Sequence, residues 1–281
     1  MISAPNLTVA DLLKGDIKLA SPPTAYLALK RIVDDPAKTL KDAAVIIEND
    51  AALAMRLLKI VNSAFYGLPS QVSSIATAIS LIGMRELENL VLATVVIERF
   101  SDLPGQIMSI HDFWAKNLRS ALVSKELDMH FGRQFPDTAF LCGLVHNIGQ
   151  LVMYRRIPVL AREVDLLIQS NANSDVDEAT VEEQVIGFDH YALGAELCRL
   201  WKLPLVVIDS IALHRYPDHT GPNTHIAALV RLAHYFSRAE TAQEGMLVAD
   251  GLELTADQLT SILDKVHNEF EVIFKLFYPT K

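Results

Sequence analysis

The sequence predicts an all-α protein built from two helical lobes. Apolar residues recur at the spacing of one helix face, most clearly at Leu141, Leu144, Val145 and Ile148, which fall at i, i+3, i+4 and i+7. No stretch stands out with the apolar–polar alternation of a half-buried strand, and no segment repeats at a fixed period. The chain has 281 residues, of which 51% are hydrophobic, and this is enough for two lobes with a buried core.

The predicted first lobe covers residues 1–100 and is divided into helices by capping residues. Pro22 opens the first helix, because proline suits the first turn. Thr39, Asp50 and Ser74 each stand directly before an apolar-periodic segment, where a short polar side chain can cap a helix. These signals predict helices over residues 22–33, 39–47, 51–61, 74–82 and 86–100.

The predicted second lobe covers residues 101–281 and begins at the breaker segment Ser101–Gly105. Asp189 is a good N-cap for the helix that follows it, and Thr255 is expected to cap the first of two closing helices. The remaining helices are predicted over residues 113–129, 136–153, 158–170, 178–187, 190–201, 204–214 and 224–239.

Net charge argues against a nucleic-acid partner. The formal charge is −9, whereas nucleic-acid binding depends on clustered lysine and arginine. The segment Ala43–Gly67 has the outline of a helix-turn-helix, but it offers only Arg56 and Lys59. We therefore interpret this segment as core packing.

Cysteine usage and hydropathy predict a cytoplasmic protein. Cys142 and Cys198 both lie in apolar helical segments, which suits reduced thiols. The N-terminus has neither the basic nor the apolar region of a signal peptide. Residues 60–84 carry no charge, but polar residues, glycine and proline interrupt them, so we expect no membrane span.

His146 lies off the apolar stripe of the central segment. Its neighbours on that side are Cys142, Gly143 and Gly149, and such small residues let a second helix approach closely. We expect His146 to point into a cleft between helices. From spacing alone it is either a core histidine with its hydrogen bonds satisfied or part of a site.

The segment Gly143–Gly149, Gly-Leu-Val-His-Asn-Ile-Gly, resembles the Gly-Leu-Leu-His-Asp-Ile-Gly segment of HD-superfamily proteins. Over about residues 22–216 the chain resembles the HDOD subfamily, the HD-related output domains of bacterial signalling proteins. This implies that the second lobe is an HD-like helical bundle. The resemblance is carried by residues 22–23, 47–53, 57–67, 74–83, 113–114, 143–149, 188–197 and 201–204.

HD hydrolases hold one or two divalent metals with histidines and aspartates from several helices. The resemblance assigns three metal positions to residues that are kept here, His146, His190 and His214. A metal at this site would be zinc, manganese or iron, acting by polarising a phosphoester and lowering the pKa of a bound water.

Other metal positions differ from the family pattern. Asn147 replaces the aspartate of the His-Asp pair, and His234 replaces a late aspartate. Lys116 and Asn117 occupy the place of the first histidine, and Arg215 follows His214 where a second histidine is common. No carboxylate remains in this set, so the resemblance implies a degenerate metal site.

We therefore expect a non-catalytic HDOD-type regulatory module without a cofactor, which binds signalling proteins or a small ligand. The oligomeric state is not predicted. Asn62, Ser63, Tyr66 and Gly67 are expected to form a structured turn that faces either the other lobe or a partner.

Two alternatives stay open. One is a metal-dependent phosphohydrolase acting on nucleotides or cyclic dinucleotides, which requires His146, His190 and His214 to converge on one ion. The other is a nucleotide sensor without turnover, in which Lys116 and Arg215 contact the phosphates.

Overall fold

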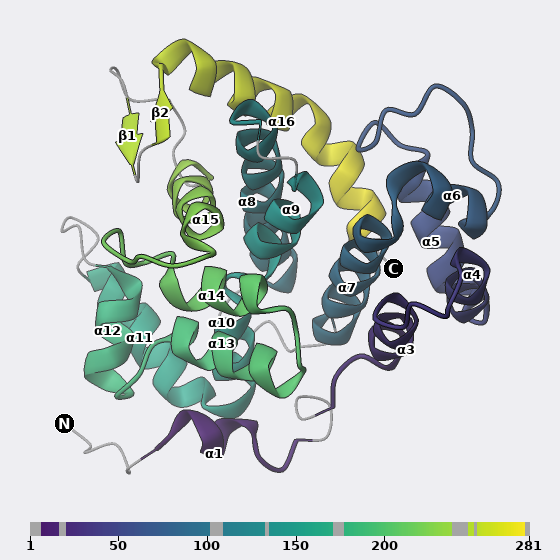
Figure 1. Cartoon of the computed structure of the whole chain (residues 1–281). Coiled ribbons are helices and arrows are strands. Elements are labelled where there is room, and N and C mark those ends of the chain that lie inside the picture. Colours follow the sequence, from purple (N-terminus) through teal and green to yellow (C-terminus); the bar gives the residue numbers. More distant parts are fainter. Residues whose placement is uncertain are drawn as a thin grey trace.

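The computed structural model describes residues 7–16, 21–101, 109–132, 135–170, 177–237, 247–249 and 252–278. Helices dominate this part of the chain and confirm the predicted all-α class (Figure 1). None of the described helices combines the length and the apolar character that crossing a membrane requires.

Among the described elements of the first lobe, α4 to α6 begin at the predicted capping residues. The side-chain oxygens of Thr39, Asp50 and Ser74 accept backbone N–H groups at the starts of these helices, which satisfies donors that have no partner within the helix. The helices are α3 (Thr24–Val33), α4 (Leu40–Glu48), α5 (Ala51–Val61), α6 (Ile75–Ile82) and α7 (Met84–Phe100).

The second lobe begins with the long helix α8 (Ile110–His130). Asp189 caps α13, as predicted, by accepting from the N–H of Ala192. The helices are α8 (Ile110–His130), α9 (Pro136–Val145), α10 (Ile148–Arg156), α11 (Pro158–Ser170), α12 (Glu178–Val185), α13 (His190–Leu200), α14 (Leu205–Leu213) and α15 (Thr224–Phe236).

Two sequence predictions in this lobe are wrong. The helix predicted over residues 136–153 is interrupted at His146 and Asn147. The sequence gives no sign of this break, because the apolar residues on both sides of it, in α9 and in α10, are buried. After Thr255 a single helix, α16 (Ala256–Phe277), stands in place of two. It follows an antiparallel hairpin of β1 (Leu247–Ala249) and β2 (Leu252–Leu254), whose strands are too short to show an alternating pattern.

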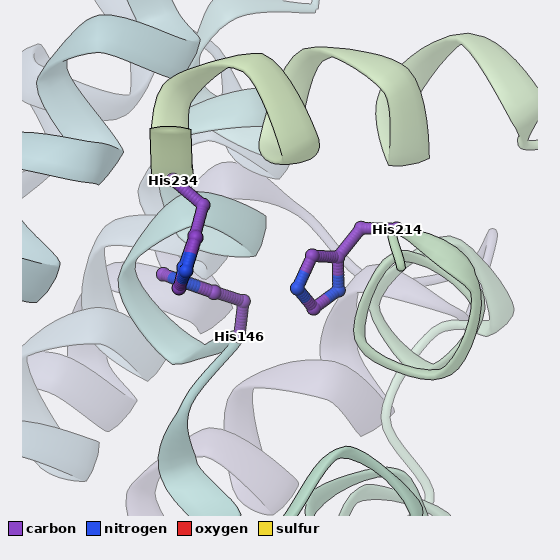
Figure 2. A group of neighbouring side chains, drawn as sticks. All are labelled: His146, His214 and His234. Atoms are coloured by element: carbon purple, nitrogen blue, oxygen red, sulfur yellow. The ribbon is translucent and has the colours of Figure 1, made fainter. Parts of the chain in front are cut away.

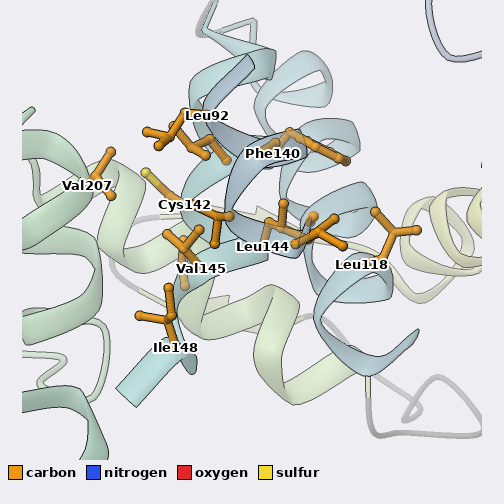
Figure 3. Close-up of a cluster of buried hydrophobic side chains, with 14 of the residues drawn as sticks. Leu92, Leu118, Phe140, Cys142, Leu144, Val145, Ile148 and Val207 are labelled. Atoms are coloured by element: carbon orange, nitrogen blue, oxygen red, sulfur yellow. The ribbon is translucent and has the colours of Figure 1, made fainter. Parts of the chain in front are cut away.

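Helix α9 lies at the centre of the second lobe and packs against α7, α8, α14 and α15. Figure 3 shows the buried α9 side chains Phe140 and Leu144 among apolar side chains of neighbouring helices, such as Leu118 of α8. Gly143 permits the close approach of α8, because a Cβ there would lie 2.6 Å from Ser124 Oγ and 2.9 Å from Ala121 Cα. The expectation that small residues admit a neighbouring helix is thus confirmed at Gly143.

Helices near both ends of the described chain cross the predicted boundary between residues 100 and 101. Helix α1 (Val9–Leu13) belongs to the first lobe in sequence, yet it packs against α10 and α13 of the second. Helix α16 runs from the hairpin along α8 to α5 of the first lobe (Figure 1). The two lobes are therefore tied together by segments outside the central helices.

The turn of residues 62–67 lies between the lobes. The side-chain amide of Asn62 donates to the carbonyl of Val72 (2.8 Å) and its oxygen accepts the N–H of Val72 (2.7 Å), which fixes the loop before α6. On the other side, Nζ of Lys125 in α8 donates to the carbonyl of Phe65 (2.9 Å). Tyr66 donates its hydroxyl to Asp137 in α9 (3.5 Å). These contacts join the turn to α8 and α9, and its role toward a partner stays a prediction.

Candidate functional site

Three histidines from separate helix ends lie together in the second lobe. His146 is the C-cap of α9, His214 is the C-cap of α14, and His234 lies in the last turn of α15. Figure 2 shows the His214 ring pointing toward the other two rings. His146 and His214 are buried and His234 is half-buried. The carbonyl-bearing ends of helices carry partial negative charge, so this junction favours a cation.

Backbone carbonyls fix the proton positions on two of these rings. The Nδ1–H of His146 donates to the carbonyl of Gly143 (2.7 Å), and that of His214 donates to two carbonyls of α14 (2.9 and 3.0 Å). Because a neutral imidazole carries one proton, Nε2 of both rings then presents a lone pair. The His146 Nε2 accepts from Nδ1 of His234 (2.7 Å). The His214 Nε2 is buried without a hydrogen-bond partner in the described part of the chain.

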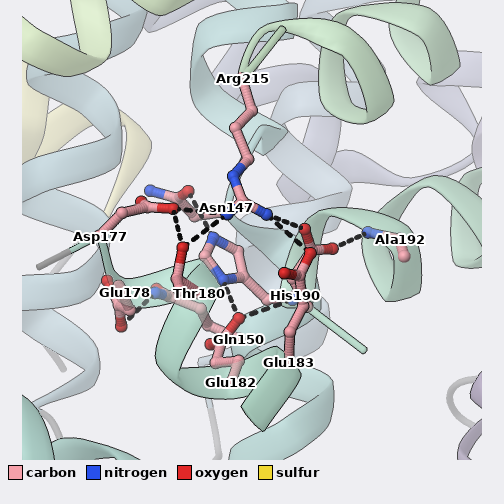
Figure 4. A network of polar contacts seen from close by, with 11 residues as sticks. Asn147, Gln150, Asp177, Glu178, Thr180, Glu182, Glu183, His190, Ala192 and Arg215 are labelled. Carbon is pink, nitrogen blue, oxygen red and sulfur yellow. Dashed lines mark hydrogen bonds and ion pairs between the residues drawn. The ribbon is translucent and has the colours of Figure 1, made fainter. Parts of the chain in front are cut away.

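His190 lies outside this cluster and is bound to a carboxylate (Figure 4). Its Nδ1–H and its backbone N–H both donate to Oε2 of Glu182 (2.6 and 2.8 Å), and its Nε2–H donates to Oδ1 of Asn147 (3.2 Å). Burial alone lowers the pKa of His190, but Glu182 outweighs burial and the pKa lies above its ordinary value. An oxygen acceptor at each nitrogen favours the imidazolium form of this ring, in which neither nitrogen has a lone pair for a metal.

Lys116 and Asn117, the other cleft candidates on α8, do not join the histidines. Asn117 is buried and its amide donates to the carbonyl of Phe113 in the same helix (2.8 Å). Lys116 lines a cavity of about 740 Å³ between α8, α15 and α16, and the described residues that line this cavity include none of the three histidines.

Arg215 is surrounded by carboxylates. It pairs with Asp177 (2.8 Å), Glu183 (2.8 Å) and Asp189 (3.0 Å), and it donates to the hydroxyl of Thr180 (2.8 Å). Figure 4 shows the guanidinium among these groups. A phosphate that bound Arg215 would have to displace carboxylates from it. Nucleotide contact by Arg215 stays a prediction.

Sequence reasoning missed Glu182, the partner of His190. It lies eight residues before His190, and no motif links the two positions. A signal was present, because Ala179, Glu182 and Ile186 share one helix face at i, i+3 and i+7, and all three are buried. A glutamate on an apolar face usually has a buried partner.

The histidine cluster fits one transition-metal ion. One ring nitrogen from each of His146, His214 and His234 lies within 4.8 Å of the other two, and no other such group of metal-binding side chains occurs among the described residues. Backbone hydrogen bonds on the outer nitrogens of His146 and His214 orient these rings as the second shell of a metal site does. The set contains no carboxylate, which leaves no charged oxygen to bridge a second ion.

The His214 side chain predicts a specific pH dependence of stability. Burial, reinforced by the charge of His190, lowers the pKa of His214 to about 4. As the pH falls from about 6.5 to about 4, the unfolded chain binds a proton that the native protein does not, so stability decreases by up to about 3 kcal/mol. Urea denaturation in the presence of a chelator measures this loss. The variant His214→Asn should show a flatter curve over this range, and parallel curves for the two proteins would contradict the prediction.

Comparisons with known proteins give one family match and one similar sequence. A family model described as the HDOD domain matches residues 19–217. A protein of Treponema pallidum (strain Nichols), named only as uncharacterized, is 27% identical over 230 residues, which are 79% of this chain and 43% of that protein. The chain therefore spans less than half the length of this relative.

Several solved structures share the fold. An HDOD domain protein of unknown function from Geobacter sulfurreducens aligns with a TM-score of 0.73 and 19% identity, covering 92% of this chain and 93% of that one. A protein from Shewanella amazonensis SB2B, named as a candidate phosphohydrolase, aligns with a TM-score of 0.66 and 24% identity, covering 91% and 87%. A candidate signal transduction protein from Marinobacter aquaeolei VT8 aligns at 0.60 and 20%, covering 91% and 55%. At these identities the likeness concerns the fold.

Proposed function

Since the chain belongs to the HDOD family, we propose that it is a regulatory module of a signalling pathway that acts by binding and not by catalysis. Its partners are signalling proteins or a small ligand such as a nucleotide. The all-α HDOD fold is retained, whereas the positions that hold metals in HD hydrolases are retained only in part. A framework kept without its reactive groups is suited to recognition.

The arrangement of His190 and Asn147 is the observation that carries this proposal. Both side chains are used within the protein, because His190 donates to Glu182 on one side and to the Asn147 oxygen on the other. In a two-metal hydrolase, the histidine at the position of His190 would bind the second ion. The carboxylate at the position of Asn147 would bridge the two ions. Here a histidine that donates to Glu182 and a neutral amide stand in their place, which disfavours the two-ion clamp that stabilises phosphoester cleavage.

A metal-dependent phosphohydrolase is the second candidate, favoured by one observation. Nitrogens of three histidines lie within 4.8 Å of one another, which is close enough for one ion after small adjustments. This set differs from the predicted trio, since His234 takes the place of His190. Hydrolysis by a single ion on a nucleotide or cyclic dinucleotide would proceed without the Asn147–His190 pair.

A hydrolysis assay separates the two candidates. The purified chain is incubated with bis-p-nitrophenyl phosphate, p-nitrophenyl phosphate and a panel of cyclic dinucleotides, in the presence of zinc, manganese or iron. We expect rates that equal those of His146→Ala under every condition. The exposed residue His130 supplies a matched control, His130→Ala. A metal-dependent rate that His130→Ala retains and His146→Ala loses would overturn the proposal in favour of the hydrolase.

A further inference from the structure

The geometry points to a binding site for a single zinc-type ion formed by His146, His214 and His234, in which the ion clamps α9, α14 and α15 together. This inference rests on the proposed regulatory function, because it gives the histidine cluster a structural role in place of a catalytic one. His190 is not a ligand of this site.

The His214 ring provides the strongest evidence for a missing partner. It is 3% exposed, and its Nε2 is buried without a hydrogen-bond partner among the described residues. A buried acceptor without a partner is unfavourable and calls for a ligand. The Nδ1–H bonds to backbone carbonyls of α14 hold the ring so that Nε2 faces the other two histidines.

The donor chemistry selects the class of ion. Three neutral imidazoles are suited to zinc, copper, nickel or iron, whereas magnesium and calcium require oxygen ligands. Three histidines and one open position form a known zinc coordination set. His146 and His214 are buried, whereas His234 is half-buried, so the cluster is not completely enclosed.

Binding requires small movements of the histidine rings. His146 Nε2 and His234 Nδ1 are 2.7 Å apart and joined by a hydrogen bond. Two nitrogens on one tetrahedral zinc, each about 2.0–2.1 Å from it, are about 3.3 Å apart. The His146 and His234 nitrogens must therefore separate by about 0.6 Å, and the proton of His234 must shift to its other ring nitrogen. The three ligand nitrogens lie within 4.8 Å of one another, so the His214 nitrogen must also move closer to the other two. A bound metal would replace the hydrogen bond between α9 and α15 with coordination bonds to α9, α14 and α15.

Titration with metal alone tests the site. Zinc uptake is measured by calorimetry, and cobalt serves as a spectroscopic probe because its visible absorption reports coordination geometry. We expect one equivalent of zinc, a tetrahedral cobalt spectrum, and a rise in Tm of about 5 °C or more at saturating zinc. His234→Ala and His234→Gln should each weaken zinc binding about 100-fold or more, since loss of a ligand exceeds the effect of losing a second-shell partner.

Two controls make the result specific. His190→Gln should leave zinc affinity within about threefold of the natural protein, whereas it would abolish binding if His190 were a ligand. His130→Ala should bind like the natural chain, and circular dichroism verifies that each variant is folded. Absence of uptake by the folded natural protein, or uptake that both His234 variants retain, would overturn the inference.

The same samples distinguish this inference from the proposed function. Zinc uptake without phosphoester hydrolysis supports both. Zinc uptake with hydrolysis supports the site and overturns the regulatory proposal, and absence of both overturns the site alone.

Discussion

Replacing Lys125 with methionine is expected to lower the free energy of unfolding by about 3–5 kcal/mol. The Lys125 side chain is 9% exposed and its Nζ lies 3.6 Å from Oδ1 of Asp137, whose side chain is 10% exposed. Burial lowers the pKa of Lys125 and raises that of Asp137, which shows that both charges are costly to bury. Their pairing offsets this cost, so the loss of one partner leaves the other charge buried alone.

The same substitution also removes contacts between the lobes. Nζ of Lys125 lies 3.3 Å above the centre of the Phe65 ring and donates to the Phe65 carbonyl. Phe65 in turn contacts Phe140 of α9 and Phe277 of α16, with ring centres 4.9 and 5.8 Å apart. One side chain thus holds the inter-lobe turn against three helices of the structure.

Urea denaturation followed by circular dichroism measures this effect. Lys265→Met is the matched control, because Lys265 pairs with Glu126 at 2.8 Å but its side chain is 48% exposed. Exposed pairs contribute less than about 1 kcal/mol. If Lys125→Met were no more destabilising than Lys265→Met, the buried pair would not be holding the lobes together.

Gly149→Ala is expected to destabilise the protein by about 3 kcal/mol or more. A Cβ at this position would lie 1.9 Å from the carbonyl oxygen of His190 and 2.8 Å from the backbone nitrogen of Gly194. Both are backbone atoms of α13, so α10 and α13 would have to separate. That movement would also displace His190 from Glu182 and Asn147, so the substitution acts on the fold and the site together.

Thermal and urea unfolding of this variant can be compared with those of Gly221→Ala. Near Gly221 the added Cβ would meet only the His219 side chain, at 3.0 Å, which can move aside in its loop. We expect a change within about 0.5 kcal/mol there. Similar stabilities for the two variants would mean that α10 and α13 can separate at little cost, contrary to the packing described.

Local chemistry explains which parts of the fold were predictable. Thr39, Asp50, Ser74, Asp189 and Thr255 all cap helices where their sequence positions indicated, because a cap depends only on residues within one turn. The all-α class was also predictable, because the spacing of apolar residues along a helix is a local pattern. The break at His146 and Asn147 was hidden, since α9 and α10 bury the same apolar stripe on either side of it.

The candidate site was less predictable because its contacts join residues far apart in the sequence. His146 and His234 are 88 positions apart and are joined by a hydrogen bond. His190 instead hydrogen-bonds to Glu182 and to Asn147, and Asn147 is 43 positions away in the sequence. Spacing and resemblance could name these histidines but could not sort them into two groups. Which histidines meet depends on how α12, α13 and α15 pack against the other helices, and this packing is a property of the tertiary structure.

The central claim is that the polar groups of the cleft form two separate sets, the cluster of His146, His214 and His234, and the His190–Glu182–Asn147 network. NMR of isotope-labelled histidine tests it most directly, because the chain has only nine histidines. Spectra of His190→Gln and His234→Gln assign the relevant signals. At neutral pH we predict that zinc shifts the ring-nitrogen signals of the cluster and leaves those of His190 unchanged. A zinc-dependent shift of the His190 signals, or no shift in any of the nine, would contradict the account.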